Sequence, residues 1–533
     1  MASAAIPTHV TSPADRAEIY RVRYLIAFAV TLASMLELID TSIVNVALPH
    51  MMGNLGATLE EIAWVSTGYI VANVIVLPLT PWLADRFGRR NYSVGSIVLF
   101  TIASFFCGNA TSLEGLVMWR VIQGIGGGAL IATAQAIMFD IFPIHERGIG
   151  MAIFGIGVMV GPSLGPTLGG WITDNYNWPW IFYINLPLGI LAALLCWRLV
   201  PEPSQRVQRS ASVDWLGIAL LIVGIGALQV LLERGESKDW LDSAEIRVEL
   251  LIAAAGLIGF VWHELTTEHP IVDLRVLKNR QLAAGVLFGS ALGMALFASI
   301  FALPVFLQRG LGYSAEVTGW IILPGAIASA VTMAMMGRLI ARIDVRWSIV
   351  PGVFLYFVSM VMHYHLTSES GPSDLWWPLI LRGIGLGMIF PPLTQAAVAD
   401  LKPYQYGQGT GLFSLSRQLG GSLGIAAVAS LVTRFSESAY DGLRSHLSAA
   451  DPATALRMDA ITQRFMSLGN TAETARMKAL QLMDFTVRKQ AGVVAFEKIF
   501  LIMGVAFVLA LPLLLLFKTG RIRGSGAAKA AAH

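Results

Sequence analysis

The sequence predicts an all-α protein that crosses a lipid membrane fourteen times. Of its 533 residues, 55% are hydrophobic and 13% carry a charge, about half the charged share of roughly 25% that is usual in soluble domains. Fourteen apolar stretches approach the roughly 20 residues that a helix needs to cross a hydrocarbon core about 30 Å thick. Lys and Arg gather in alternate loops between these stretches, as they do in multi-pass membrane proteins.

The apolar stretches follow one another along the chain with mostly short connections. The first is too long for a signal-peptide core and has no suitable cleavage site, so we expect it to remain as a helix. The third, seventh and eighth are the shortest. The predicted spans are residues 24–47, 62–82, 92–107, 113–139, 148–172, 180–200, 215–232, 248–262, 283–307, 318–339, 347–366, 375–399, 409–432 and 496–517.

The distribution of basic residues predicts that both ends of the chain are cytoplasmic. With the N-terminus inside, most of the 37 Lys and Arg residues fall in cytoplasmic loops, which retain them. The segment 433–495 then lies outside, where long loops cross regardless of charge. The short outer loops hold only Arg234, Lys238, Arg247 and Arg309.

Internal repetition predicts two six-helix bundles separated by two extra helices. Arg120-Val-Ile-Gln-Gly in the fourth span resembles Arg382-Gly-Ile-Gly in the twelfth, and the loop 83–90 resembles the loop 339–346, again eight spans later. Parallel repeats of this kind build the halves of membrane transporters. The predicted regions are a cytoplasmic segment 1–23, a bundle 24–200, a linker with two helices 201–282, a bundle 283–517 that includes the outer segment 433–495, and a tail 518–533.

Two carboxylates in the first span are the main candidates for chemistry. Glu37 and Asp40 are three residues apart and share a helix face. A carboxylate at mid-membrane costs about 2.5–3.5 kcal/mol and favours its neutral form, which makes proton uptake and release feasible. The alternative for Asp40 is a fixed ion pair with Arg120. Glu37 binds a cationic substrate, shares the titration with Asp40, or faces an aqueous cavity.

Three arginines lie deep inside the predicted spans, away from their ends: Arg120, Arg382 and Arg417. A buried arginine stays charged, so each needs a partner or water. For Arg382 and Arg417, a static role against backbone carbonyls and a direct role in transport both stay open.

Two motifs predict where the halves move. In the loop after the second span, Gly88 provides the positive φ of a tight turn, and its charged residues either hold the halves together on the inside or only anchor the topology. The fifth span is dense in glycine and proline, which predicts close helix packing and a bendable seam. The loop residues are Asp85, Arg86, Gly88, Arg89 and Arg90, and the fifth-span residues are Gly161, Pro162, Gly165, Pro166, Gly169 and Gly170.

The sequence of the outer segment 433–495 predicts two helices outside the membrane. Asp451-Pro452 is typical of a helix start, Gly469-Asn470 of a stop, and a second helix is expected over 471–490. One apolar stripe either packs on the protein's own surface or the lipid interface, or forms a docking surface for a partner. Its residues are Met458, Ile461, Phe465 and Leu468.

Several co-linear motifs resemble those of the major facilitator superfamily. The loop 83–90 is similar to its signature after the second span, and 161–170 to the fifth-span signature of its antiporters. The first-span sequence 39–49 resembles that of the fourteen-span drug:proton antiporters. Leu232-Glu-Arg-Gly and His269-Pro-Ile-Val-Asp-Leu narrow the resemblance to the EmrB type.

The resemblance implies a major facilitator fold and proton-coupled multidrug efflux across the inner membrane, driven by the proton gradient without a cofactor. It implies hydrophobic or cationic small-molecule substrates, a periplasmic adaptor (membrane fusion protein) and an outer-membrane channel. The acidic first-span residue of the family falls on Asp40, and Arg120 with Gln123 matches the family's fourth-span pattern, in which the arginine is implicated in proton transfer, whereas the family need not be acidic at the position of Glu37. We expect Asp40, Glu37 and Arg120 to serve proton coupling, and Asn45, Gln123, Arg382 and Arg417 to line the substrate pathway.

Other classes of function find little support in the sequence. There is no nucleotide-binding loop and no Cys/His cluster at metal-ligand spacing, so we expect neither an enzyme nor a metal site. Cys107 and Cys196 lie in separate apolar runs, which predicts no disulfide, and the net charge of +3 predicts no nucleic-acid partner. The alternatives are a metabolite or fatty-acid symporter or uniporter of the same fold, and a non-transporting receptor that acts through 439–495.

Overall fold

The computed structural model describes residues 13–143, 146–201, 213–268, 270–340, 343–402, 405–447 and 451–517. This part of the chain is helical and contains no β-strand. Residues 1–12, the predicted tail 518–533 and His269 of the sequence motif lie outside it.

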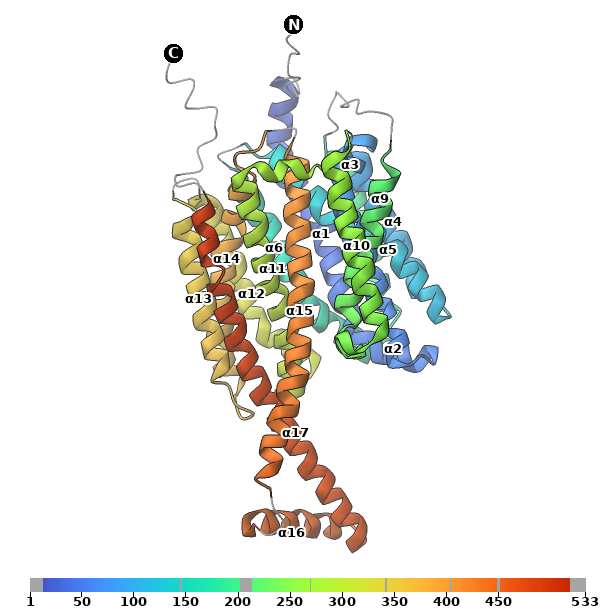
Figure 1. The fold of residues 1–533 in the computed structure, drawn as a ribbon, viewed down its shortest axis with the longest axis vertical. Coiled ribbons are helices and arrows are strands. Elements are labelled where there is room, and N and C mark those ends of the chain that lie inside the picture. Colours follow the sequence, from blue (N-terminus) through green and yellow to red (C-terminus); the bar gives the residue numbers. More distant parts are fainter. Residues whose placement is uncertain are drawn as a thin grey trace.

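The helices run along one common direction and form two neighbouring bundles (Figure 1). The N-terminal bundle consists of α1 (Pro13–Leu55), α2 (Leu59–Ile62), α3 (Trp64–Phe87), α4 (Arg89–Gly108), α5 (Leu113–Ile141), α6 (Arg147–Asn175), α7 (Trp180–Tyr183) and α8 (Asn185–Leu199). The linker forms α9 (Trp215–Arg234) and α10 (Ala244–Thr266). The C-terminal bundle consists of α11 (Arg280–Val305), α12 (Ala315–Leu339), α13 (Arg346–Tyr364), α14 (Pro372–Val398), α15 (Tyr406–Ser445) and α17 (Ala472–Val508).

Thirteen helices in the described part are long and apolar enough to cross a membrane. The predicted eighth span, α10, is not among them, and its first turns carry Glu245, Arg247 and Glu249. It still contains 23 residues, which gives a length of about 35 Å, and it packs along α9. The start of α1 and the end of the last short helix, η6 (Leu511–Leu516), lie at the same end of the bundle (Figure 1), which requires an even number of crossings.

The two bundles repeat the same helix pairings. In the N-terminal bundle α1 packs on α6, and α5 packs on both α3 and α4; in the C-terminal bundle α11 packs on α15, and α14 packs on both α12 and α13. Each pairing recurs eight spans later, as the sequence repeat predicts. The bundles meet along two seams, α6 against α12 and α3 against α15.

The outer segment is an extension of two membrane helices. α15 and α17 continue beyond the bundle, and α16 (Pro452–Ser467) lies across their ends (Figure 1). The predicted start of α16 is confirmed, because Asp451 accepts a hydrogen bond from the Thr454 amide at 3.0 Å. The predicted stop is also confirmed, because Gly469 follows the end of the helix with a φ of 88°. The predicted end of the second helix at 490 is wrong, since α17 runs from Ala472 into the last span without a break.

Candidate functional site

The centre of the N-terminal bundle holds a fully buried ion pair. Arg120 on α5 donates through Nη1 to Oδ2 of Asp40 on α1 at 2.5 Å, and the two side chains are 1% and 0% exposed. The guanidinium also donates to the Val65 carbonyl at 3.0 Å and lies over the Tyr69 ring at 4.1 Å from its centroid. The ion pair that the sequence offers as the alternative role of Asp40 is therefore present in this conformation.

Two amides complete the shell around this carboxylate. Gln123 on α5 and Asn185 on α8 each donate to Oδ1 of Asp40 at 2.9 Å. Gln123 in turn accepts from Arg120 at 2.7 Å, and Asn185 also donates to Ser104 on α4 at 3.0 Å. Four helices of one bundle thus supply ligands for one charge pair, which satisfies groups that would otherwise be costly to bury.

Glu37 lies apart from this pair, at the seam between the bundles. Its Oε1 accepts from Asn73 on α3 at 2.8 Å, and its buried Oε2 has no hydrogen-bond partner among the described residues. Arg417 on α15 of the other bundle attracts it electrostatically. Arg417 is also buried, and its guanidinium faces the Phe390 ring at 5.6 Å. Glu37 of the N-terminal bundle therefore interacts electrostatically with Arg417 of the C-terminal bundle.

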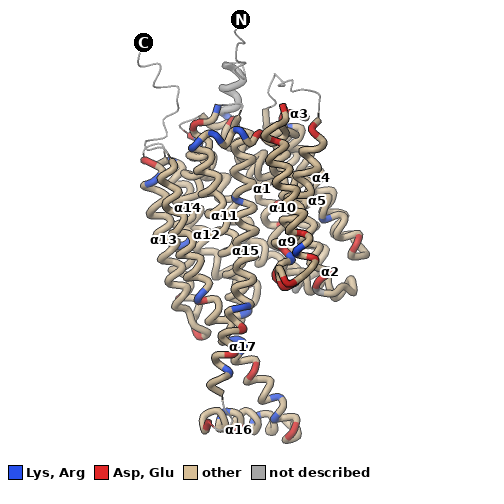
Figure 2. Tube along the Cα trace, viewed as in Figure 1, with Lys and Arg blue, Asp and Glu red and all other residues tan. Residues whose placement is uncertain are grey.

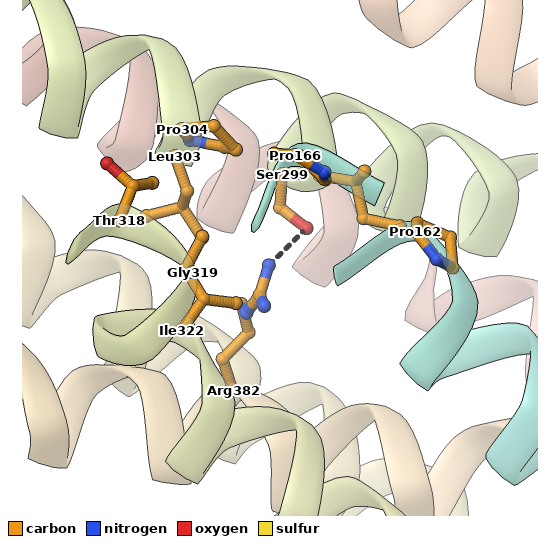
Figure 3. A pocket seen from close by; sticks show the side chains of 10 residues that line it. Pro162, Pro166, Ser299, Leu303, Pro304, Thr318, Gly319, Ile322 and Arg382 are labelled. Atoms are coloured by element: carbon orange, nitrogen blue, oxygen red, sulfur yellow. Dashed lines mark hydrogen bonds between the residues drawn. The ribbon is translucent and has the colours of Figure 1, made fainter. Parts of the chain in front are cut away.

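Arg382 occupies a small pocket at the α6–α12 seam (Figure 3). Its Nη1 donates to Oγ of Ser299 on α11 at 3.1 Å. Pro162 and Pro166 of the fifth-span motif form the wall from the N-terminal bundle, and Thr318 on α12 lies on the opposite side. Asn45 on α1, also predicted to line the pathway, is exposed and accepts a hydrogen bond from the Ser66 hydroxyl at 3.1 Å.

The loop after α3 forms contacts inside its own bundle and borders the other one. Gly88 has a φ of 88°, as the turn requires, and Arg89 pairs with Asp140 on α5. Arg86 lies over Trp82, and Arg90 over Trp197. Asp85 and Arg89 also line a second pocket together with Gly407 and Thr410 of α15.

One contact that crosses the seam on this side involves a residue that the sequence did not single out. Arg147, at the start of α6, donates to the Tyr406 hydroxyl at 3.2 Å and lies 4.9 Å from the centre of its ring. Lys and Arg concentrate at this end of the bundle (Figure 2).

The fifth-span glycines fit α6 between α1 and α12. A Cβ on Gly165 would collide with Ser42, one on Gly161 would lie 3.0 Å from the Leu38 Cβ, and one on Gly169 would lie 2.8 Å from Ile43. Gly170 faces Ala315 on α12 in the same way, at 2.9 Å. The glycines therefore serve close packing on both sides, and α6 remains one continuous helix through both prolines.

The sequence analysis missed Asn73, Asn185 and Ser299, which form hydrogen bonds with Glu37, Asp40 and Arg382, respectively. The available signal was that each lies inside a predicted span, where a polar side chain is costly unless it is paired. A rule that collects all amides within spans would have found the first two.

Comparisons with known proteins agree with this architecture. A family model described as Major Facilitator Superfamily matches residues 30–425. The chain is 34% identical over 453 residues to the multidrug export protein EmrB of Escherichia coli K12, covering 85% of this chain and 87% of that one. It is 31% identical over 501 residues to the fatty acid resistance protein FarB of Neisseria gonorrhoeae, covering 94% and 97%. A solved structure of the human organic anion transporter MFSD10 shares the fold at 15% identity, with a TM-score of 0.58 over 95% of this chain and 100% of that one.

Proposed function

The chain belongs to the Major Facilitator Superfamily and is a multi-pass membrane transporter rather than an enzyme, and on this basis we propose that it exports amphipathic drug-like molecules in exchange for protons. The relative with 34% identity is named a multidrug export protein. The observation that supports proton coupling is the buried ion pair of Asp40 and Arg120, in which a titratable carboxyl group lies against a permanent positive charge inside the N-terminal bundle.

Protonation of Asp40 changes the balance of forces inside the N-terminal bundle. The neutral carboxyl loses its Coulomb attraction to Arg120, whose charge must then rely on the Val65 carbonyl, Gln123 and the Tyr69 ring. Because Arg120 remains charged, the shell has to rearrange or admit water. A proton that enters from outside is thereby converted into a shift of α1 against α5.

Glu37 links this shift to the seam. It lies one helical turn before Asp40 on α1, and the charge that it attracts, Arg417, belongs to the other bundle. Neutralisation of Glu37 removes an attraction between the bundles and favours their separation. In this proposal Asp40 couples proton binding to a change inside the N-terminal bundle. Glu37 couples it to the contact between the two bundles.

Dye efflux in everted vesicles tests this proposal. Accumulation of ethidium in vesicles whose interior is acidic should be lost in Asp40→Asn and strongly reduced in Glu37→Gln. Asp459→Asn on the exposed face of α16 is the matched control and should behave as the unmodified protein. Full ethidium transport by Asp40→Asn after the gradient is collapsed would exclude proton coupling at this site.

We also propose that the chain resides in the inner membrane with cytoplasmic termini and docks a periplasmic adaptor that leads to an outer-membrane channel. The support is the helical extension of α15, α16 and α17, which lies at the end opposite to the cluster of basic residues (Figures 1 and 2). Leu456 on α16 and Leu468, directly after its end, are both 71% exposed, whereas Met458 and Phe465 on α16 are half-buried. Photo-crosslinkers at Leu456 and Leu468 should capture an adaptor in cells, and the same probes at Trp347 in the opposite end should not.

A second candidate function is fatty-acid transport. It is favoured by the similarity to a protein named for fatty acid resistance, which covers 94% of this chain. The direction of the proton flux separates a symporter from an antiporter: in everted vesicles, substrate addition alkalinises the interior only if the two fluxes are opposed.

A further inference from the structure

The loop between α9 and α10 lies at the end of the bundles from which α15 and α17 extend, close to α2 (Figure 1). This loop, residues 235–243, contains two short 3₁₀ turns, η1 (Glu236–Lys238) and η2 (Trp240–Asp242). The sequence motif Leu232-Glu-Arg-Gly leads directly into it, and the proposed export mechanism assigns no role to this motif. The contacts of the loop with both bundles indicate such a role.

One side of the loop is bound to α15 of the C-terminal bundle. Nε1 of Trp240 donates to Oγ of Ser430 at 2.7 Å and to Oε2 of Glu236 at 3.1 Å. The Trp240 ring also packs against an apolar cluster that includes Ile246 of α10 and Ala426 of α15. Ser430 lies close to the end of the predicted thirteenth span, residues 409–432. The loop therefore holds α15 near the point where this helix leaves the bundle.

The other side of the loop contacts the N-terminal bundle. Nζ of Lys238 lies 3.1 Å from Oε2 of Glu60 on α2. The guanidinium of Arg234, in the motif, lies 5.1 Å from the centre of the Trp64 ring at the start of α3. Arg234 also pairs with Glu245 on α10 at 3.0 Å. The α9–α10 loop thus bridges the two bundles at one end of the α3–α15 seam.

The backbone of the loop is strained at the residue that contacts α15. In the described part of the chain, Asp239 and Trp240 are the only non-glycine residues with a positive φ, at 57° and 50°. A bulky side chain is disfavoured in this conformation, which persists only where the surrounding structure holds it. The motif glycine, Gly235, makes room for the Trp240 ring, because a Cβ at Gly235 would lie 2.6 Å from that ring. Backbone strain that directs one side chain towards the other bundle points to a functional contact.

At the opposite end, where Lys and Arg concentrate (Figure 2), the bundles are closed in this conformation. Arg147 on α6 donates to the Tyr406 hydroxyl on α15 there, and a Cβ on Gly148 would collide with the carbonyl oxygen of Gly337 on α12. Rocking of the bundles that opens this basic end also changes the separation of α2 from α15 at the other end. The contacts of the loop fit the present separation, so the movement breaks at least one of them.

We propose that the α9–α10 loop is a strap that holds α2 to α15 and thereby favours the conformation in which the basic end is closed, with Trp240 as its positioning residue. A contact that forms in one of two conformations stabilises that conformation and shifts the population towards it. The strap acts on the movement of the bundles, whatever the substrate or the coupling ion. It therefore goes beyond the proposed export function.

Distances across the basic end measure this population. Spin labels at Arg21→Cys on α1 and Trp347→Cys on α13, both exposed, are measured by double electron–electron resonance in lipid nanodiscs, without substrate or proton gradient. Both native cysteines are buried. Trp240→Phe keeps an aromatic ring and removes the indole N–H. It should raise the ratio of long to short distances about fivefold, which corresponds to the loss of a hydrogen bond worth about 1 kcal/mol.

Further variants assign the effect to the strap. Trp262→Phe on α10 is the matched control, because Trp262 is 70% exposed, and it should keep the ratio of the unmodified protein. Ser430→Ala should raise the ratio, and its addition to Trp240→Phe should raise it little further, because both remove the same hydrogen bond. Glu60→Lys should raise the ratio by repulsion of Lys238, and the combination with Lys238→Glu should reverse part of this increase.

A purely structural role of Trp240 gives a different result. Trp240→Phe would then lower the free energy of unfolding and leave the ratio of distances unchanged. A ratio that stays the same or falls in Trp240→Phe overturns the proposal, and so does an unchanged ratio in Glu60→Lys, since a strap has to be held at both ends. The distances need no proton gradient, so this result leaves the proposed export function intact. Absence of proton-driven ethidium efflux would likewise leave the strap intact.

Discussion

Removal of either charge of the buried pair should destabilise the protein far more than removal of both. Asp40 accepts hydrogen bonds from Arg120 at 2.5 Å and from Gln123 and Asn185 at 2.9 Å, with no exposed surface. Asp40→Asn leaves the arginine uncompensated, and Arg120→Gln leaves the carboxylate uncompensated, so each should cost about 3–5 kcal/mol. The double variant buries only neutral amides and should lie within about 1–2 kcal/mol of the unmodified protein.

The assay is a double-mutant cycle on the free energy of unfolding, measured by SDS titration of the purified protein in mixed micelles. We expect the two single variants to lose stability, and the sum of their two losses should exceed the loss of the double variant by several kcal/mol. The double variant should fold and yet remain inactive in proton-driven ethidium efflux, since it has lost the titratable group. Additive costs in the cycle would refute the ion pair as the source of the effect.

Three further predictions concern packing, the seam and the outer helices. Gly165→Ala should destabilise the protein by about 1–3 kcal/mol in the same titration, and Ser42→Ala should restore part of the loss, because the new Cβ would collide with the Ser42 side chain. Tyr406→Phe removes the hydroxyl that Arg147 contacts at 3.2 Å and should increase labelling of a cysteine placed at that end of the seam; unchanged labelling would show that the contact does not hold the bundles. The capping hydrogen bonds from Thr454 hold the pKa of Asp451 below its usual range, so its carboxylate stabilises α16 at neutral pH, and this contribution should fade as the pH falls through the lowered pKa. The hydrogen-exchange protection factors of the first turn of α16, corrected for the intrinsic exchange rate at each pH, should fall at acid pH in the unmodified protein and stay constant in Asp451→Asn.

The sequence was sufficient to predict the architecture because membrane insertion imposes strong rules. Apolar length, the alternation of basic loops and the eight-span repeat each constrain the fold, and the helix pairings repeat as expected. The pairing of Asp40 with Arg120 was also foreseeable, since two opposite charges inside one bundle are costly apart. The segment 433–495 was harder to predict, because a helix outside the membrane needs no apolar residues, and the polar part of α17 gave no sign that it continues the last span.

The different surroundings of Glu37 and Asp40 could not be predicted from their spacing. Three residues on an α-helix differ by about 60° in direction, which is compatible with one shared face. In the structure that angle is enough for Asp40 to point into the N-terminal bundle and for Glu37 to reach Asn73 and the seam. The difference depends on where α3, α5 and α15 lie around α1, which is a property of the tertiary packing. Ser299 was missed for a related reason, since its role appears only by comparison with Asp40 across the repeat.

The unbroken course of α15 has a mechanical consequence. This helix of 40 residues carries Arg417 in the membrane and reaches the junction with α16 at its far end, a length of about 60 Å. A stiff rod acts as a lever: the part of α15 beyond Arg417 is about 42 Å long, so a tilt of about 10° at the seam would displace its tip by roughly 7 Å. Any protein bound to α16 would therefore be displaced in each transport cycle, and the position of the tip would depend on the charge state of the ionisable residues at the centre of the membrane.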